Sequence, residues 1–142
     1  MKIISINIST EKGTVKKPVG KGSFLVNFGM ENDAHGGDWH RQISLLGIES
    51  IEKFEKTNNV KLEYGAFAEN ITTSGVVLHE LPIGTKMKIN DVILEVTQIG
   101  KKCHLGCEIS KQVGECVMPK EGIFAKVLNA GEIKNGDSIE LL

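Results

Sequence analysis

The side chains best suited to sulfur or metal chemistry are those of the segment Gly100 to Cys107. Within it, Cys103 lies between Lys102 and His104. Neighbouring cations stabilise the thiolate, which is the form of cysteine that attacks electrophiles and binds soft metals. Loops that follow strands commonly hold functional residues. The sequence therefore predicts a functional thiol at Cys103, against the plainer alternative of a small buried cysteine beside two solvated lysines.

The cysteines also permit a second interpretation. A C-H-x2-C-x8-C pattern is formed by Cys103, His104, Cys107 and Cys116. These residue types bind tetrahedral zinc, but the pattern lacks the paired short spacing that is usual in the second half of such sites. A zinc or redox module is therefore the alternative hypothesis, with Cys107 otherwise a secondary thiol and Cys116 a packing residue. Three cysteines cannot all pair, which disfavours a disulfide framework.

A second polar segment, residues 33–42, combines hydrogen-bond donors with glycines. Its candidate ligand contacts are His35, Gly36, Gly37, His40 and Arg41. Histidine and arginine suit a phosphate or an oxyanion, and paired glycines allow the backbone to approach a ligand closely. The alternative is a solvated turn before a strand. Because the only tryptophan lies in the same segment, we favour a functional role.

A third pair, Glu69 and Asn70, places two hydrogen-bonding side chains at the entrance of another expected strand. By itself this pair is typical of an ordinary turn.

These segments must be held by a mainly β framework. Alternating or β-branched apolar residues predict strands over 4–8, 15–18, 24–28, 42–46, 70–73, 76–78, 87–89, 92–99, 123–128 and 138–142. Residues 47–59 carry apolar side chains at helical spacing and predict a helix that covers a sheet. Many short strands with glycine turns indicate a single-domain, closed or partly closed β-barrel over residues 1–142, with one or two short helices.

Composition excludes several classes of protein. The chain has 142 residues with 17 basic and 18 acidic side chains, so its net charge of −1 argues against nucleic acid or a membrane surface as partner. No stretch approaches the ~20 apolar residues of a membrane span. The alternating N-terminus is unlike a signal peptide, so we expect a cytoplasmic protein with reduced thiols.

Taken in order, these segments resemble the MOSC domain, the family named for the C-terminal domain of molybdenum cofactor sulfurases. The matching stretches are Asp33-Ala34-His35-Gly36-Gly37, His40-Arg41-Gln42-Ile43-Ser44, Gly65-Ala66-Phe67-Ala68-Glu69-Asn70-Ile71-Thr72, Leu81-Pro82-Ile83-Gly84, Glu95-Val96-Thr97-Gln98, Cys103 and Gly131-Glu132-Ile133-Lys134-Asn135-Gly136-Asp137. The resemblance covers essentially the whole chain. One departure is Ala68, which stands where glycine is common in the family.

The resemblance implies a barrel-like fold that binds the molybdenum-pterin cofactor. Cys103 would be a persulfide carrier or the molybdenum ligand, and the cofactor-binding residues would be His35, Gly36, Gly37, His40, Arg41, Glu69, Asn70, Lys102 and His104. Some members of the family reduce N-hydroxylated compounds with this cofactor. The sequence leaves open whether this chain is an enzyme, and whether it would then be such a reductase or a sulfur transferase.

The resemblance also implies partners. Pyridoxal phosphate belongs to a separate domain of the sulfurases that these 142 residues do not contain. We therefore expect sulfur to come from a donor such as a cysteine desulfurase, and the cofactor from molybdenum cofactor biosynthesis proteins. The oligomeric state is not indicated.

Overall fold

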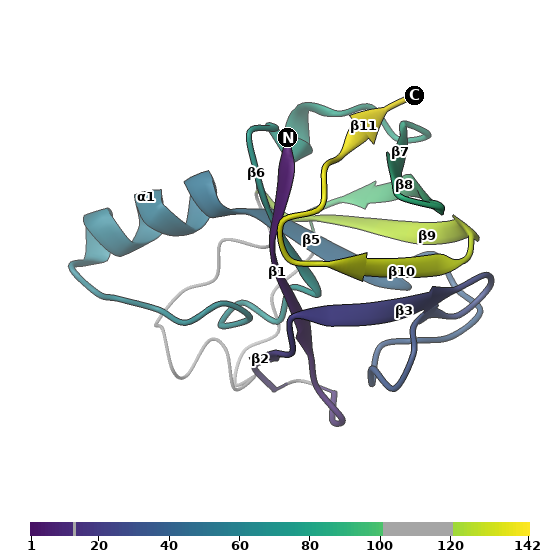
Figure 1. Ribbon diagram of the computed structural model, residues 1–142. Coiled ribbons are helices and arrows are strands. Elements are labelled where there is room, and N and C mark those ends of the chain that lie inside the picture. Colours follow the sequence, from purple (N-terminus) through teal and green to yellow (C-terminus); the bar gives the residue numbers. More distant parts are fainter. Residues whose placement is uncertain (13, 101–120) are drawn as a thin grey trace.

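The computed structural model of the protein describes residues 1–12, 14–100 and 121–142 (Figure 1). Its strands are β1 (Lys2–Ile8), β2 (Lys17–Pro18), β3 (Lys21–Leu25), β4 (Gly29–Met30), β5 (Ile43–Gly47), β6 (Ile71–Ser74), β7 (Lys86–Ile89), β8 (Val92–Ile99), β9 (Ile123–Asn129), β10 (Gly131–Lys134) and β11 (Glu140–Leu141). The helices are α1 (Ile48–Asn58) and a short 3-10 helix, η1 (Leu78–Glu80). One sheet has the strand order β11-β7-β8-β9-β5-β6-β1-β2, and a smaller one has the order β10-β3-β4.

The larger sheet curls until its two ends meet. Strand β1 pairs with β6 on one side, and on the other it reaches the chain just before β11. The N–H of Ile3 donates to the carbonyl of Asp137 at 2.8 Å, and the N–H of Gly136 donates to the carbonyl of Ile3 at 2.7 Å. Both chain ends therefore lie on the same side of the molecule (Figure 1). The expected mainly β, partly closed barrel is confirmed.

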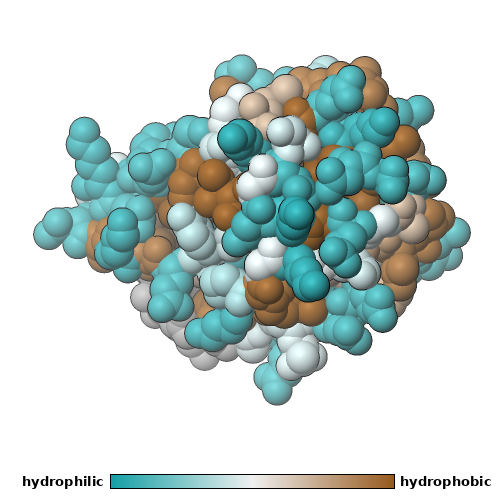
Figure 2. All heavy atoms as spheres, in the orientation of Figure 1, coloured by the Kyte–Doolittle hydropathy of each residue, from teal (hydrophilic) through white to brown (hydrophobic). Residues whose placement is uncertain are grey.

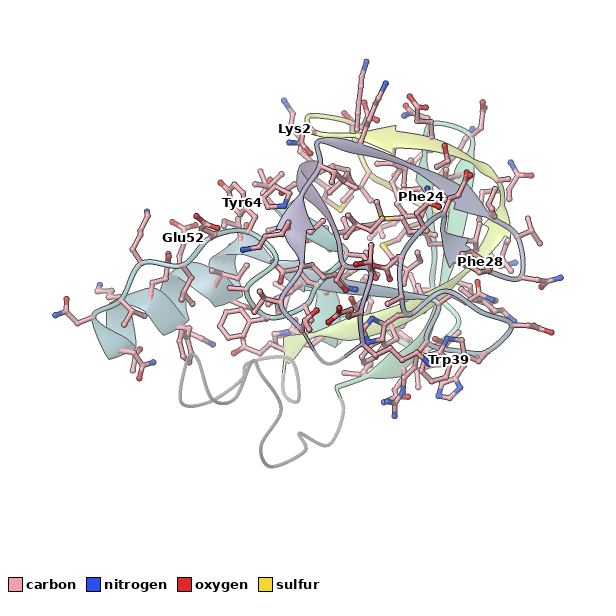
Figure 3. All side chains as sticks on the ribbon, turned by 90° about the horizontal axis from the view of Figure 1, so that it is seen from below. Lys2, Phe24, Phe28, Trp39, Glu52 and Tyr64 are labelled. Carbon is pink, nitrogen blue, oxygen red and sulfur yellow. The ribbon has the colours of Figure 1, made fainter. Side chains whose placement is uncertain are left out.

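The barrel interior is filled by aliphatic side chains from both sheets. Phe24 of β3 is fully buried among them, and Figure 3 shows it directed inward. A second apolar cluster lies under α1, where the rings of Phe54 and Phe67 meet edge to face at 5.1 Å between centroids. On the face in Figure 2, hydrophilic side chains separate the exposed hydrophobic patches.

Helix α1 links two parallel neighbouring strands, β5 and β6. It buries Ser50, Ile51 and Phe54 and ends at Asn59, which adopts a left-handed conformation with φ 52° and donates its N–H to Glu55. The predicted helix over 47–59 is thus confirmed to within one residue at each end. It projects from the side of the barrel (Figure 1).

Two predicted strands are wrong. The alternation over 24–28 does not continue as one strand, because β3 ends at Leu25 and Asn27, with φ 61°, turns the chain back into β4. This turn leaves Val26 47 % exposed. Residues 76–78 lead instead into η1, after a turn at Gly75 whose φ is 80°.

The inner face of β1 also differs from the expected alternation of Ile4, Ile6 and Ile8. A bulge between Ile3 and Ser5 turns Ile3 inward and leaves Ile4 half-buried. Ser5 and Asn7 are fully buried, and Ser5 Oγ donates to Asn7 Oδ1 at 2.7 Å. The barrel therefore contains a buried polar region next to its aliphatic core.

In the part of the chain that the structure describes, no helix has the length and apolar character needed to cross a membrane.

Candidate functional site

The loop between β4 and β5 is held against the end of β8 by Gln98. Gln98 Oε1 accepts a hydrogen bond from Arg41 Nε at 3.0 Å and lies 3.0 Å from His40 Nε2. The Gln98 amide donates to the carbonyl of Gly100 at 2.7 Å. Thr97 Oγ1 also bonds the carbonyl of His40. The predicted donors His40 and Arg41 are thus brought to the position where the chain leaves β8.

The Arg41 guanidinium lies near two aromatic rings. Its central carbon is 5.9 Å from the ring centre of Trp39 and 5.4 Å from that of Phe124. Aromatic faces attract cations and help to fix the planar group. Within residues 1–12, 14–100 and 121–142, no carboxylate forms an ion pair with Arg41. Since one guanidinium carries five donors, this arrangement is suited to an anion such as phosphate.

His35 lies at the inner side of the loop, next to a buried ion pair. Lys16 Nζ is 2.8 Å from Asp33 Oδ1, and both side chains are 0 % exposed. The same ammonium is 3.0 Å from His35 Nδ1. Burial alone would raise the pKa of Asp33, but the Lys16 charge and hydrogen bonds from Lys16 and the Ser9 N–H outweigh it, so the pKa lies below its usual value. Asp33 is therefore ionised.

The two glycines of the loop have different surroundings. A Cβ on Gly36 would come within 2.4 Å of the Phe28 ring, so the Phe28 side chain would have to shift to admit one. A Cβ on Gly37 would meet only the Trp39 side chain, at 3.7 Å. Trp39 itself donates its indole N–H to the carbonyl of His35 at 2.9 Å. Figure 3 shows Phe28 and Trp39 on the same side of the molecule, away from Glu52 of α1.

Glu69 and Asn70 are fully buried and bonded within the protein. Asn70 Oδ1 accepts from the Ser44 N–H at 3.0 Å. Glu69 accepts from the N–H groups of Gly65 and Phe67 at 3.0 and 3.1 Å and from a threonine hydroxyl at 2.9 Å. Burial nevertheless raises the pKa of Glu69 above its usual value. Both residues hold the backbone beside the site, and direct contact with a cofactor stays a prediction.

The backbone is left-handed at the residue before Glu69. Ala68 adopts φ 63°, a conformation in which glycine has no steric penalty.

Residues 101–120, which contain all three cysteines, lie outside the described residues. This applies to the predictions for Lys102, Cys103, His104, Cys107 and Cys116. The flanking positions are described, and the N–H of Gly100 donates to the carbonyl of Gly122 at 2.7 Å. Elsewhere in the described chain, no three His, Cys, Asp or Glu side chains gather as a metal site.

Sequence reasoning missed Lys16 and did not single out Gln98. Nothing in Val15-Lys16-Lys17-Pro18 distinguishes a buried lysine from its solvated neighbour. Gln98 had a usable signal in the sequence, because it is a polar residue near the end of the predicted strand 92–99, directly before the segment Gly100 to Cys107.

Comparisons with known proteins give one family model and several solved structures of the same fold. A family model described as the MOSC domain matches residues 31–140. The YflK protein of Bacillus subtilis strain 168 is 25 % identical over 145 residues, which cover 93 % of this chain and 64 % of YflK. The crystal structure of YuaD from Bacillus subtilis superposes with a TM-score of 0.81 at 20 % identity, covering 99 % of this chain and 94 % of that one. The crystal structure of YiiM from Geobacillus stearothermophilus gives 0.73 at 20 % identity, covering 99 % and 74 %.

Proposed function

The chain belongs to the MOSC domain family, and from this membership we propose that it binds the molybdenum-pterin cofactor at the loop between β4 and β5. The observation that carries the proposal is the position of Arg41. Its guanidinium is oriented by Gln98 and two aromatic rings, and no described carboxylate neutralises it. A partly buried cation that has no ionic partner among the described residues favours binding of an anion, and the pterin cofactor carries a phosphate.

The donor set fits such a group. Arg41 and His40 would bind the phosphate, and His35 would reach an acceptor oxygen from the inner side of the loop. Trp39 offers an exposed aromatic face beside them. Bound there, the cofactor would supply a soft metal centre for redox or sulfur chemistry.

We assign the sulfur chemistry to Cys103. It follows Gly100 by three residues in the sequence, and a chain spans at most about 3.6 Å per residue. Gln98, which orients Arg41, also bonds Gly100. As a thiolate, Cys103 could ligate molybdenum. It could equally accept a sulfane sulfur from a donor persulfide, in which case the donor leaves as a thiolate. A cysteine desulfurase is the class of partner that supplies such sulfur.

The first experiment tests cofactor binding. The chain is expressed in a host that makes the cofactor and purified without oxygen, and molybdenum and pterin are measured per protomer. We expect near-stoichiometric molybdenum and pterin in the wild type. Loss of the Arg41 contact in Arg41→Ala should lower affinity about 10- to 100-fold. Lys126→Ala is the matched control, because Lys126 is a half-exposed cation paired with Glu95 on β8, outside the donor set.

The outcome that overturns the proposal is wild-type protein without molybdenum or pterin. Stoichiometric zinc that disappears in Cys107→Ala or Cys116→Ala would support the zinc module in its place.

A second experiment separates the two roles of Cys103. Incubation with a cysteine desulfurase and cysteine should make a carrier about 32 Da heavier, the mass of one sulfur atom. Cys103→Ala should abolish the adduct, whereas Cys116→Ala should keep it. A ligand role predicts no adduct and a loss of molybdenum in Cys103→Ala, so unchanged molybdenum together with no adduct would exclude both roles.

A further inference from the structure

Lys16 is buried, and the chemistry of its partners shows which atom donates and which accepts in each of its hydrogen bonds. Its ammonium lies 2.8 Å from Asp33 Oδ1, 3.1 Å from Ser9 Oγ and 3.0 Å from His35 Nδ1. Ser9 Oγ donates its own proton to the carbonyl of Glu11 at 3.1 Å, so it accepts from Lys16. Asp33, an ionised carboxylate, can only accept.

These directions determine the protonation of His35. An ammonium has three donors and no lone pair, so the atom that faces it at 3.0 Å must be an acceptor. Nδ1 of His35 therefore carries no proton, and the neutral ring carries its proton on Nε2. We propose that Lys16 is a positioning residue that holds His35 as the neutral Nε2–H tautomer, so that His35 acts as a hydrogen-bond donor to the ligand of this site and not as an acid.

The charges around the ring agree with this assignment. An imidazolium would place a second cation 3.0 Å from the buried ammonium. Asp33 Oδ2 lies 3.9 Å from His35 Nδ1 and would favour an imidazolium. The ammonium is nearer to the ring, however, and it already neutralises that carboxylate through the contact at 2.8 Å. Counted over these three described side chains, Lys16, Asp33 and a neutral His35 carry no net charge, whereas a charged ring would add one positive charge to the set.

The backbone of His35 is also held in place. The backbone N–H of His35 donates to Asp33 Oδ2 at 3.1 Å, and the His35 carbonyl accepts from the Trp39 indole at 2.9 Å. The side chain of His35 is 28 % exposed. Because Nδ1 accepts from Lys16, the ring proton lies on Nε2, and Nε2 is the donor of the ring. On the proposed function, its partner is an acceptor oxygen of the anionic cofactor.

The tautomer is tested on the cofactor-free chain, so the result does not depend on cofactor binding. In a long-range proton–nitrogen correlation spectrum of the nitrogen-15-labelled protein, His35 should show a non-protonated Nδ1 and a protonated Nε2. This pattern should be the same at pH 8 and pH 6. A protonated Nδ1, or an imidazolium at pH 7, would overturn the proposal.

Two variants show whether Lys16 is the cause. Lys16→Met should release the preference, so that His35 shows a mixture of tautomers and becomes protonated on acidification. Ser9→Ala keeps the ammonium beside the ring and should leave the tautomer unchanged. If Lys16→Met does not fold, the wild-type and Ser9→Ala spectra still decide, because a wild-type tautomer mixture contradicts the proposal.

The donor role is tested separately by cofactor content. His35→Gln keeps an N–H donor and should retain most of the molybdenum and pterin, whereas His35→Phe should lose affinity about 10-fold. Equal loss in both variants would overturn the donor role. Failure of the wild type to bind cofactor would refute the proposed function and leave the tautomer result standing.

Discussion

Replacement of Lys16 by methionine removes the cation of a fully buried ion pair and keeps most of the apolar volume of the side chain. The carboxylate of Asp33 then stays buried with only N–H donors. Removing one partner of a buried pair typically costs about 3–5 kcal/mol. Asp33 can limit this loss by taking up a proton. For a carboxyl of ordinary pKa 3.8, that costs about 4.4 kcal/mol at pH 7, at about 1.36 kcal/mol per pH unit.

The same reasoning gives a pH dependence. In the wild type, the lowered pKa of Asp33 means that its stabilising contribution is present above the pKa of the unfolded chain and is lost as pH falls through the folded value. In Lys16→Met the pKa should be raised, so stability should fall as pH rises above 3.8. The difference between the two proteins should reach at most about 4 kcal/mol at pH 7 and about 1.6 kcal/mol at pH 5, because protonation of His35 beside Asp33 Oδ2 is a second way to neutralise the carboxylate.

Denaturant unfolding at several pH values between 5 and 8 measures this difference. The double variant Lys16→Met/Asp33→Asn is the control, because it has no buried charge at this position. It should unfold with a smaller loss than the single variant and with little pH dependence. A loss in Lys16→Met that does not change with pH, or a double variant no more stable than the single one, would refute the buried ion pair.

Three other results are expected. Gly65→Ala should lower the free energy of unfolding by at least about 3 kcal/mol, because a Cβ at φ 88° would lie 2.4 Å from the carbonyl oxygen of Lys16. Gly84→Ala is the control: Gly84 has a similar φ of 95° but open space around it, so the loss should be about 1–2 kcal/mol. Equal losses would show that the close approach is absent. Gln98→Leu removes the acceptor that orients Arg41, so it should lower molybdenum content about 10-fold and the free energy of unfolding by about 1 kcal/mol. Unchanged molybdenum content would show that Gln98 does not contribute to the site. The raised pKa of Glu69 should make the wild type lose stability relative to Glu69→Gln as pH rises above 4.5, and a parallel pH dependence of the two proteins would contradict it.

The strands and α1 could be predicted where one face of a segment is apolar. Strand β8 and α1 were predicted nearly to the residue because burial follows the local period there. The predictions were wrong where the backbone turns without a change in hydrophobicity, as at Asn27, or where a bulge shifts the inward face, as at Ile3 and Ser5. A bulge depends on pairing with β6, which is distant in the sequence.

The candidate site shows the same division. The sequence alone identified the donors of the loop 33–42, because residue type indicates what a side chain can bind. Its prediction that the Gly36 backbone approaches a ligand stays a prediction, and the contact between Gly36 and the Phe28 ring appears only in the folded chain. The link from Gln98 to Arg41 joins residues 57 positions apart, so no local pattern contains it.

Lys16 and Lys17 illustrate what only the tertiary structure decided. The sequence determined that two adjacent cations precede a proline in a short edge strand. Folding places Lys17 in solvent and Lys16 at 1 % exposure. Burial of a charged lysine is costly unless a carboxylate compensates the loss of water, and that carboxylate, Asp33, comes from another part of the chain. The protonation of His35 therefore depends on a contact that exists only in the folded protein.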